Sequence, residues 1–295
     1  MSGFRSGFVA LLGKPNVGKS SLLNRLVGTK VAIVSSKPQT TRRRILGVLH
    51  GGDHQIVFVD TPGMAKPLHA LGRKMLEAAR SEGREADMIV FVTEVTHEPT
   101  SEDRSVVGYL RQLEKPLILV GNKLDLRSLE EGLQALAEYR RLADFELALP
   151  VSAHTGQGLA QLVEALEARL PEGPPFFPAD QVTDQNQRIL IEEILREKVL
   201  RNTRQEIPHS VAVQVEEMRP GEDPSLLYVS AYLYVERDSQ KGIVIGKGGA
   251  LLKKIGAEAR QELEGLLGQK IFLDLWVKVK HDWREREDWL AALGY

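Results

Sequence analysis

The chain has 295 residues, a formal net charge of −1 at neutral pH and no cysteine. This length accommodates two domains, each large enough to bury its own core. A balanced charge gives no general attraction to nucleic acid, so any such binding needs a local basic patch. The lack of cysteine excludes disulfide frameworks, thiolate metal sites and cysteine nucleophiles.

The N-terminal stretch is too short for a secretion signal and lacks a small-residue cleavage site. No apolar run reaches the ~18 residues that are needed to span a bilayer. We therefore expect a cytoplasmic protein, with partial peripheral binding at the inner face of the cell membrane as the alternative.

From Phe8 to about Leu170, short apolar runs alternate with amphipathic stretches. The runs are bounded by Gly, Pro, Asn or Asp, as expected for strands that are buried on both faces. This α/β alternation predicts a mainly parallel sheet flanked by helices, with one antiparallel hairpin of Ile45–His50 and Gln55–Asp60. The other predicted strands are Phe8–Leu12, Met88–Val92, Leu117–Gly121 and Leu147–Val151, and the predicted helices are Ser20–Val27, Leu68–Arg84, Glu102–Gln112, Leu129–Arg141 and Leu159–Leu170.

A proline-rich stretch from Pro171 to Pro178 follows, which cannot continue a helix or complete a sheet ladder. We place the first domain at residues 1–172, a linker at 173–183 and a second domain at 184–295. Two strands follow one another directly in the second half, which predicts an α+β domain. Its predicted elements are a helix at Asn186–Arg201, strands at Ser210–Met218 and Leu226–Glu236, two helices within Gly242–Leu267, and a strand at Lys270–Lys280.

The segment Gly13–Ser20 has the pattern G-x-x-x-x-G-K-S of a phosphate-binding loop, between a predicted strand and a predicted helix. Glycines let backbone N–H groups surround phosphate oxygens, and the helix N-terminus adds positive potential. We expect Lys19 to reach the β- and γ-phosphates and the Ser20 hydroxyl to bind Mg²⁺. The residues expected to contact the nucleotide here are Gly13, Lys14, Pro15, Asn16, Val17, Gly18, Lys19, Ser20 and Ser21.

The sequence Asp60-Thr61-Pro62-Gly63 closes the second strand of the predicted hairpin. An acid at this place can hold Mg²⁺ through a water, and the Gly63 N–H can touch a γ-phosphate that only the triphosphate carries. An ordinary D-x-P-G turn is the alternative for this tetrapeptide taken alone.

Two further motifs follow strands on the same side of the predicted sheet. In Asn122-Lys123-Leu124-Asp125, the aspartate can accept both the N1–H and the exocyclic amine of guanine. Adenine has no such pair of donors and leaves the carboxylate unpaired, a discrimination of ~10⁴-fold. In Ser152-Ala153, the Ala153 N–H can bond the guanine O6. The motifs together predict a site for GTP and GDP.

These motifs resemble those of the translation-factor-related branch of Ras-like GTPases. The resemblance implies that Gln39–Arg42 is the first switch and that Thr41 completes a Mg²⁺ shell with Ser20 and Asp60. Thr40 is the alternative ligand, because sequence alone does not separate adjacent threonines. No residue stands out as a general base, so the catalytic residues are expected to be Lys19, Thr41, Asp60, Gly63 and Asn16.

Met64 occupies the place where Ras-type enzymes carry a water-orienting glutamine. A thioether cannot orient a nucleophilic water, so unaided hydrolysis is expected to be slow. Relatives with an apolar residue here commonly have an asparagine matching Asn16, which helps to hold K⁺ beside the phosphates. A turn residue without contact to K⁺ is the alternative for Asn16.

In the second half, Gly246-Lys247-Gly248-Gly249 forms a G-x-x-G loop within an α-β-β-α-α-β order. Such a loop clamps about four nucleotides of single-stranded RNA, although the tetrapeptide alone is more often a turn. Lysines without any acid occupy the stretch from Lys241 to Ala257, and Leu252 is a candidate for the floor of an apolar groove. The residues expected to bind RNA are Lys241, Ile243, Ile245, Gly246, Lys247, Gly248, Gly249, Lys253, Lys278 and Lys280.

This order of elements resembles a prokaryotic-type KH domain. A Ras-like domain followed by such a domain resembles, nearly from end to end, the Era family of bacterial GTPases. The resemblance implies a switch that hydrolyses GTP, binds the 3′ end of small-subunit ribosomal RNA and acts in assembly of the small ribosomal subunit. A membrane-surface GTPase and an RNA-binding protein with structural GTP are the alternatives, and no obligate homo-oligomer is inferred.

Overall fold

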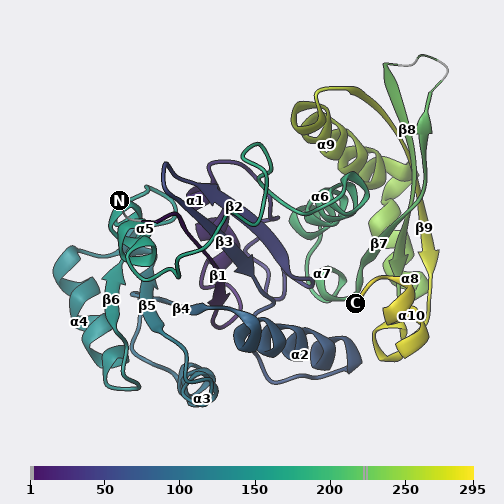
Figure 1. Ribbon diagram of the computed structural model, residues 1–295. Helices are drawn as coiled ribbons and strands as arrows, with labels where there is room; N and C mark the ends of the chain where they lie inside the picture. The colour runs from purple at the N-terminus through teal and green to yellow at the C-terminus, as the bar shows by residue number, and fades with distance from the viewer. Residues whose placement is uncertain (1–2, 222, 224) are drawn as a thin grey trace. The chain divides into compact units, whose positions relative to one another are not determined.

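The computed structural model describes residues 3–221, 223 and 225–295 (Figure 1). Residues 1 and 2 of the expected first domain, and 222 and 224 of the second, lie outside the described residues. The chain forms two compact units that divide between Asp184 and Gln185, with the short segments 35–37 and 69–71 grouped with the second unit. In the part of the chain that is described, the helices are too short or too polar to span a bilayer.

The first unit is built on a six-stranded sheet with the order β2-β3-β1-β4-β5-β6 among the described residues. All neighbours are parallel except β2 and β3, which form the predicted antiparallel hairpin. The strands are β1 (Arg5–Leu12), β2 (Ile45–His50), β3 (His54–Asp60), β4 (Met88–Glu94), β5 (Leu117–Asn122) and β6 (Leu147–Pro150), and the helices are α1 (Lys19–Val27), α2 (Ala70–Glu85), α3 (Ser101–Leu110), α4 (Leu129–Arg140) and α5 (Leu159–Glu167).

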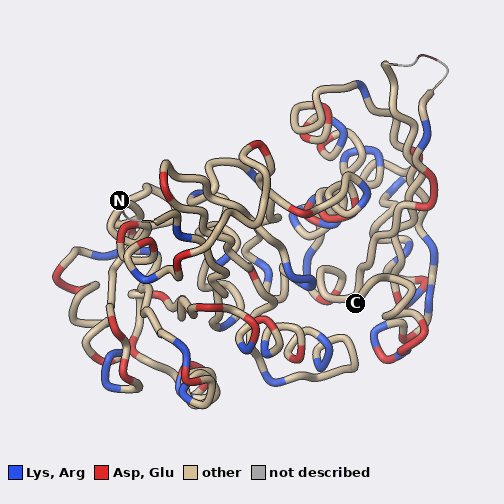
Figure 2. Tube along the Cα trace, in the orientation of Figure 1, with Lys and Arg blue, Asp and Glu red and all other residues tan. Residues whose placement is uncertain are grey.

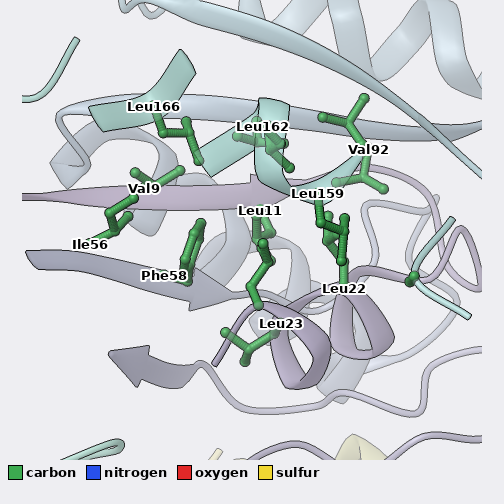
Figure 3. Packing of buried hydrophobic residues seen from close by; sticks show 14 of the residues in the cluster. Val9, Leu11, Leu22, Leu23, Ile56, Phe58, Val92, Leu159, Leu162 and Leu166 are labelled. Atoms are coloured by element: carbon green, nitrogen blue, oxygen red, sulfur yellow. The ribbon is translucent and has the colours of Figure 1, made fainter. Parts of the chain in front are cut away.

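Both faces of this sheet are buried, as the continuous apolar runs predict. Alternate side chains of β1 point to opposite faces, so Val9 and Leu11 join one cluster while Ala10 and Leu12 join the other. Helices α1 and α5 cover the first face, where Leu22, Leu159 and the other side chains of this cluster pack against the strands (Figure 3). Residues of α2, α3 and α4 pack in the second cluster.

The segment 173–183 lies along the sheet and its edge strand β2. The Val48 N–H donates to the Val182 carbonyl at 2.9 Å, and the Thr183 hydroxyl donates to the Leu46 carbonyl at 2.7 Å. The Gln55 side chain binds the backbone of Phe176 and Phe177. These contacts occupy polar groups that an uncovered edge strand would leave open.

In the described part of the second unit, three strands form a sheet with the order β7-β8-β9. Strands β7 and β8 are antiparallel, whereas β8 and β9 are parallel because a helical crossover joins them. Helices α6 and α9 pack against this sheet (Figure 1). The elements are α6 (Gln187–Asn202), α7 (Ile207–Ser210), β7 (Ala212–Pro220), β8 (Leu226–Val235), α8 (Asp238–Ile245), α9 (Ala250–Leu267), β9 (Lys270–Val279) and α10 (Glu287–Ala292).

The predicted start of a strand at Ser210 is wrong, because Ser210 ends the short helix α7. His209 lies in the short helix α7, and β7 starts only at Ala212. Pro208 stands at the start of this helix, where its missing N–H costs nothing. The prolyl residue therefore begins a helical turn rather than an extended segment.

Candidate functional site

The phosphate loop lies between β1 and α1 at the carboxyl edge of the parallel strands, where ligands of α/β sheets bind. Gly18 has a φ of 95°, and a Cβ there would lie 2.2 Å from the Asn122 side-chain nitrogen. That nitrogen donates to the Val17 carbonyl at 2.9 Å, which ties the loop to the end of β5. Asn16 also has a positive φ of 66°, a conformation that asparagine tolerates better than most residues.

Lys19 is buried at the centre of this loop. Its ammonium donates to the carbonyls of Gly13 at 3.2 Å and Lys14 at 2.9 Å. Burial lowers the pKa of Lys19 to about 8, and the nearby Asp60 carboxylate opposes this shift. A phosphate placed in the loop would add negative charge beside this buried cation and favour its protonated form.

The side chain of Lys14 is directed away from its own loop and toward α3. Its ammonium lies 2.8 Å from the Asp103 carboxylate and 3.1 Å from the Thr100 hydroxyl, with only 10% and 1% of the Lys14 and Asp103 side chains exposed. Asp103 also closes the capping box of α3 by accepting from the Thr100 N–H at 2.9 Å. Any contact of Lys14 with a nucleotide therefore falls to its backbone.

Three oxygen-bearing side chains from separate segments meet beside the loop. The Ser20 hydroxyl donates to the Asp60 carboxylate at 2.5 Å, and the Thr41 hydroxyl lies 2.8 Å from Ser20 and 3.1 Å from Asp60. The second carboxylate oxygen of Asp60, Oδ1, is buried and accepts no hydrogen bond from the described residues. Such a set of hard oxygen ligands fits Mg²⁺, and it is the Thr41 hydroxyl that meets the other two groups.

Asp60 combines burial with several stabilising contacts. Burial raises the pKa of Asp60, while Lys19 and the hydroxyls of Ser20 and Thr41 counteract the shift. A divalent cation at this carboxylate would favour its ionised form for the same reason that Lys19 does.

The D-x-x-G segment is held against the phosphate loop. The Met64 N–H donates to the Gly13 carbonyl at 3.0 Å, and a Cβ on Gly63 would lie 2.5 Å from the Pro15 nitrogen. The Met64 side chain packs in the core cluster on the α2 and α3 face of the sheet. Met64 is therefore unable to orient a water at the phosphates, as its chemistry already indicates.

The motifs that follow β5 and β6 are joined by side-chain contacts. The Ser152 hydroxyl donates to the Asp125 carboxylate at 2.5 Å, and the Ala153 N–H donates to the Asn122 side-chain oxygen at 3.0 Å. Lys123 pairs with Glu94 at 3.0 Å. A guanine O6 would therefore have to share or replace the bond that the Ala153 N–H makes to Asn122.

In the second unit, the G-x-x-G loop joins α8 to α9 through three glycines with positive φ. These are Gly246 at 73°, Gly248 at 59° and Gly249 at 81°, conformations that other residues rarely adopt. A Cβ on Gly248 would meet no atom within 4 Å, which leaves room for the backbone of a ligand. Gly248 and Lys247 are both exposed.

A groove of about 410 Å³ begins at this loop and runs between α9 and β9. Gly249, Leu252 and Lys253 line it, as expected for three of the residues that the sequence singled out. Arg260 of α9 and Phe272 of β9 also line it, and neither was predicted. The alternation of β9 could have suggested Phe272, whereas Arg260 lies a helical turn beyond the basic stretch that carried the prediction.

The remaining residues predicted for RNA lie outside the residues that line this groove. Lys241, Ile243 and Ile245 belong to α8, where Ile243 is exposed and Ile245 half-buried. Lys278 and Lys280 lie over the rings of Tyr232 and Trp289. Figure 2 shows Lys and Arg interspersed with Asp and Glu along the chain, in agreement with its balanced charge.

A phosphate loop, a D-x-x-G segment and an N-K-x-D motif on a mainly parallel sheet, followed by a G-x-x-G unit, define a P-loop GTPase with a KH domain. The 50S ribosome-binding GTPase family matches residues 8–123, and the KH domain family matches residues 206–284. The chain is 48% identical to GTPase Era of Heliobacterium modesticaldum over 295 residues, which cover 100% of this chain and 98% of that protein. It is 47% identical to GTPase Era of Carboxydothermus hydrogenoformans over 292 residues, covering 99% and 98%.

Two solved structures are similar to this chain, and each comparison covers 99% of this chain and 99% of the chain in that structure. One is a tyrosine-to-alanine variant of Aquifex aeolicus Era bound to GDP·AlF4⁻, at 43% identity and a TM-score of 0.96. The other is Era in complex with MgGDPNP and nucleotides 1506–1542 of 16S ribosomal RNA, at 42% identity and a TM-score of 0.97. The chain belongs to the Era family and is a GTPase, which confirms the predicted fold and the predicted class of enzyme.

Proposed function

We propose that this chain is a GTP-driven switch that binds the 3′ end of small-subunit ribosomal RNA and acts in assembly of the small ribosomal subunit. The observation that carries the proposal is the open G-x-x-G loop, with Gly248 exposed at one end of the groove between α9 and β9. It is supported by the similar Era structure, whose complex contains nucleotides 1506–1542 of 16S ribosomal RNA.

GTP and GDP would bind at the carboxyl edge of the first sheet. Backbone N–H groups of the phosphate loop and the ammonium of Lys19 would hold the phosphates, while Asp125 would read the guanine edge. Ser20, Thr41 and Asp60 would hold Mg²⁺, which neutralises charge on the phosphate oxygens when it is bound. The proposed nucleotide-binding residues are Gly13, Lys14, Pro15, Asn16, Val17, Gly18, Lys19, Ser20, Ser21, Asp60, Thr61, Pro62, Gly63, Asn122, Lys123, Asp125, Ser152 and Ala153.

Hydrolysis in this site rests on positioning and charge rather than on a general base. Lys19 would stabilise negative charge that develops on the transferred phosphoryl group. Met64 is buried and offers no hydrogen bond to the attacking water, so the unaided reaction is slow. K⁺ held with the help of the Asn16 side chain would supply the missing positive charge.

The RNA would enter the groove at the G-x-x-G loop. Gly246, Gly248 and Gly249 would let its backbone approach closely, while Lys247 and Lys253 would pair with its phosphates. The γ-phosphate would order Thr41 and Gly63, and this change in the two switch segments would alter RNA affinity. The proposal places the protein in the cytoplasm, and weak peripheral membrane binding is the alternative that liposome flotation tests.

The experiment is titration of a labelled RNA from the 3′ end of small-subunit ribosomal RNA, followed by fluorescence anisotropy. Gly248→Asp is expected to abolish binding, because it adds a carboxylate where the phosphate backbone would pass. Gly268→Asp is the matched control, since Gly268 also has a positive φ of 65° and a Cβ there meets no atom within 4 Å. Binding at the G-x-x-G loop would be refuted if both variants lost affinity equally, or if both kept the affinity of the wild type.

A further inference from the structure

The face of the second sheet that points away from α9 carries a row of aromatic side chains. The register places Tyr228 beside Phe272 and Tyr232 beside Trp276 on the paired strands β8 and β9. Phe272 is 53% exposed and Trp276 is 58% exposed, although both belong to a well-formed strand. We call Tyr228, Tyr232, Phe272 and Trp276 the aromatic face.

Polar contacts fix the orientation of these rings. The Asp274 carboxylate accepts from the Tyr228 hydroxyl at 3.1 Å and from the Trp276 indole N–H at 3.0 Å. The rings of Tyr228 and Phe272 stack at 5.8 Å with an angle of 12° between their planes. The rings of Tyr228, Phe272 and Trp276 thus have partners before any ligand arrives, which lowers the entropy cost of binding.

Two cations lie against the same rings. The Lys278 ammonium lies 3.2 Å from the centre of the Tyr232 ring, and the Arg219 guanidinium lies 4.3 Å from that of Tyr228. Two acids beside these rings already have partners, because Asp274 binds two of the rings and Glu217 pairs with Arg219 at 3.0 Å. A negatively charged ligand with flat rings therefore fits this surface better than a basic or an aliphatic one.

The aromatic face is continuous with the groove at the G-x-x-G loop. Strand β9 is the edge of its sheet, and Phe272 both lines the groove and stacks on Tyr228. A strand of RNA that leaves the groove across β9 meets Phe272 first and Trp276 next. Exposed aromatic rings beside basic side chains are how sheets stack the bases of single-stranded RNA.

We propose that the aromatic face is a second RNA-contact surface, which stacks bases of the same single strand that the G-x-x-G groove holds. The proposal rests on the function proposed above and extends it from the groove to the outer face of the sheet. Phe272 and Trp276 stack the bases, while Lys278 and Arg219 lie beside their phosphates.

The test uses the full chain and two kinds of RNA from the 3′ end of small-subunit ribosomal RNA. One is a short RNA of about four nucleotides that fills only the groove, and the others extend it on either side to about twelve nucleotides. The variant Trp276→Ala, which leaves the lining of the groove intact, is compared with Leu129→Ala, which removes a side chain that is 53% exposed in the first unit. Affinities come from anisotropy, and circular dichroism confirms that each variant is folded.

We expect Trp276→Ala to lose on the order of 10-fold in affinity for one of the extended RNAs, the size of effect that loss of one stacked base produces. Its affinity for the short RNA should stay unchanged, and Leu129→Ala should match the wild type with both. The extended RNA should also quench the fluorescence of Trp276, which the short RNA does not reach.

The outcomes separate the two proposals. If the wild type binds no RNA, the proposed function fails together with the aromatic face. If Gly248→Asp abolishes binding but Trp276→Ala keeps full affinity for both extended RNAs, only the aromatic face is refuted. That second result would leave the surface to a protein partner.

Discussion

The buried pair of Lys14 and Asp103 connects the phosphate loop to α3, and Asp103→Asn removes one of its two charges. In the wild type the ammonium and the carboxylate are 2.8 Å apart, and both side chains are at most 10% exposed. The variant leaves the Lys14 ammonium in the same buried place beside a neutral amide. Loss of one member of a buried pair costs about 3–5 kcal/mol, and we expect the lower end because the amide oxygen still accepts a hydrogen bond.

Calorimetry of the first unit's unfolding measures this cost. A loss of about 3 kcal/mol corresponds to a decrease of roughly 6–12 °C in the midpoint for a unit of this size. The double variant Lys14→Met/Asp103→Asn is the control, because it removes both charges and should regain more than half of the loss. GTP affinity should fall with Asp103→Asn, since the Lys14 carbonyl accepts a hydrogen bond from Lys19.

Three results would refute this reasoning. A midpoint for Asp103→Asn within about 1 °C of the wild type would mean that the pair contributes little to stability, as exposed pairs do. A double variant that is no more stable than Asp103→Asn would mean that the missing countercharge is not the cause. Unchanged GTP affinity in a destabilised variant would separate the pair from the geometry of the loop.

Three further predictions concern the nucleotide site. Hydrolysis, measured by phosphate release, should be faster in K⁺ than in Na⁺. The variant Asn16→Gly keeps the positive φ of 66° but removes the side-chain amide, so it should abolish that difference. Equal wild-type rates in both salts would exclude the role of Asn16. Asp125→Asn should relax the preference for GTP over ATP, measured by competition, and wild-type binding of ATP as tight as that of GTP would contradict base recognition by Asp125. Burial lowers the pKa of Lys19 to about 8, so the Lys19 ammonium of the nucleotide-free protein loses its proton as the pH rises through 8. GTP affinity should therefore fall above that pH, and GTP binding there should take up a proton. Calorimetric titration in buffers of different ionisation enthalpy detects the uptake, and its absence would contradict the reasoning.

Much of the fold follows from local patterns. The apolar runs that predict Met88–Val92 and Leu117–Gly121 become β4 and β5 with their ends extended by one or two residues. The predicted boundaries of β5 are close because Pro116 precedes this run and Gly121 and Asn122 end it in the sequence and in the structure alike. The phosphate loop is equally local, since its function needs only the turn between a strand and the next helix.

The features of the nucleotide site that the sequence did not predict depend on contacts between residues that are distant in the chain. Thr100 lies 86 positions from Lys14, and no local pattern indicates that their side chains meet. The bond from the Ala153 N–H to Asn122 depends in the same way on the placement of β5 beside β6.

The aromatic face needs the register of two strands. The sequence places Phe272 and Trp276 on the same face of one predicted strand, but it does not show that Tyr228 and Tyr232 lie beside them. The prediction that Lys278 binds RNA drew on charge alone, whereas the structure places its ammonium over the Tyr232 ring.

In the proposed switch, the nucleotide in the first unit controls RNA binding by the second. The most direct measurement is the affinity of the full chain for a labelled RNA from the 3′ end of small-subunit ribosomal RNA, determined first with a non-hydrolysable GTP analogue and then with GDP, each with Mg²⁺. We expect tighter binding with the GTP analogue, because only the triphosphate would offer a γ-phosphate to Thr41 and Gly63. Equal affinity in the two states would contradict the coupling and leave a GTPase and an RNA-binding domain that work independently.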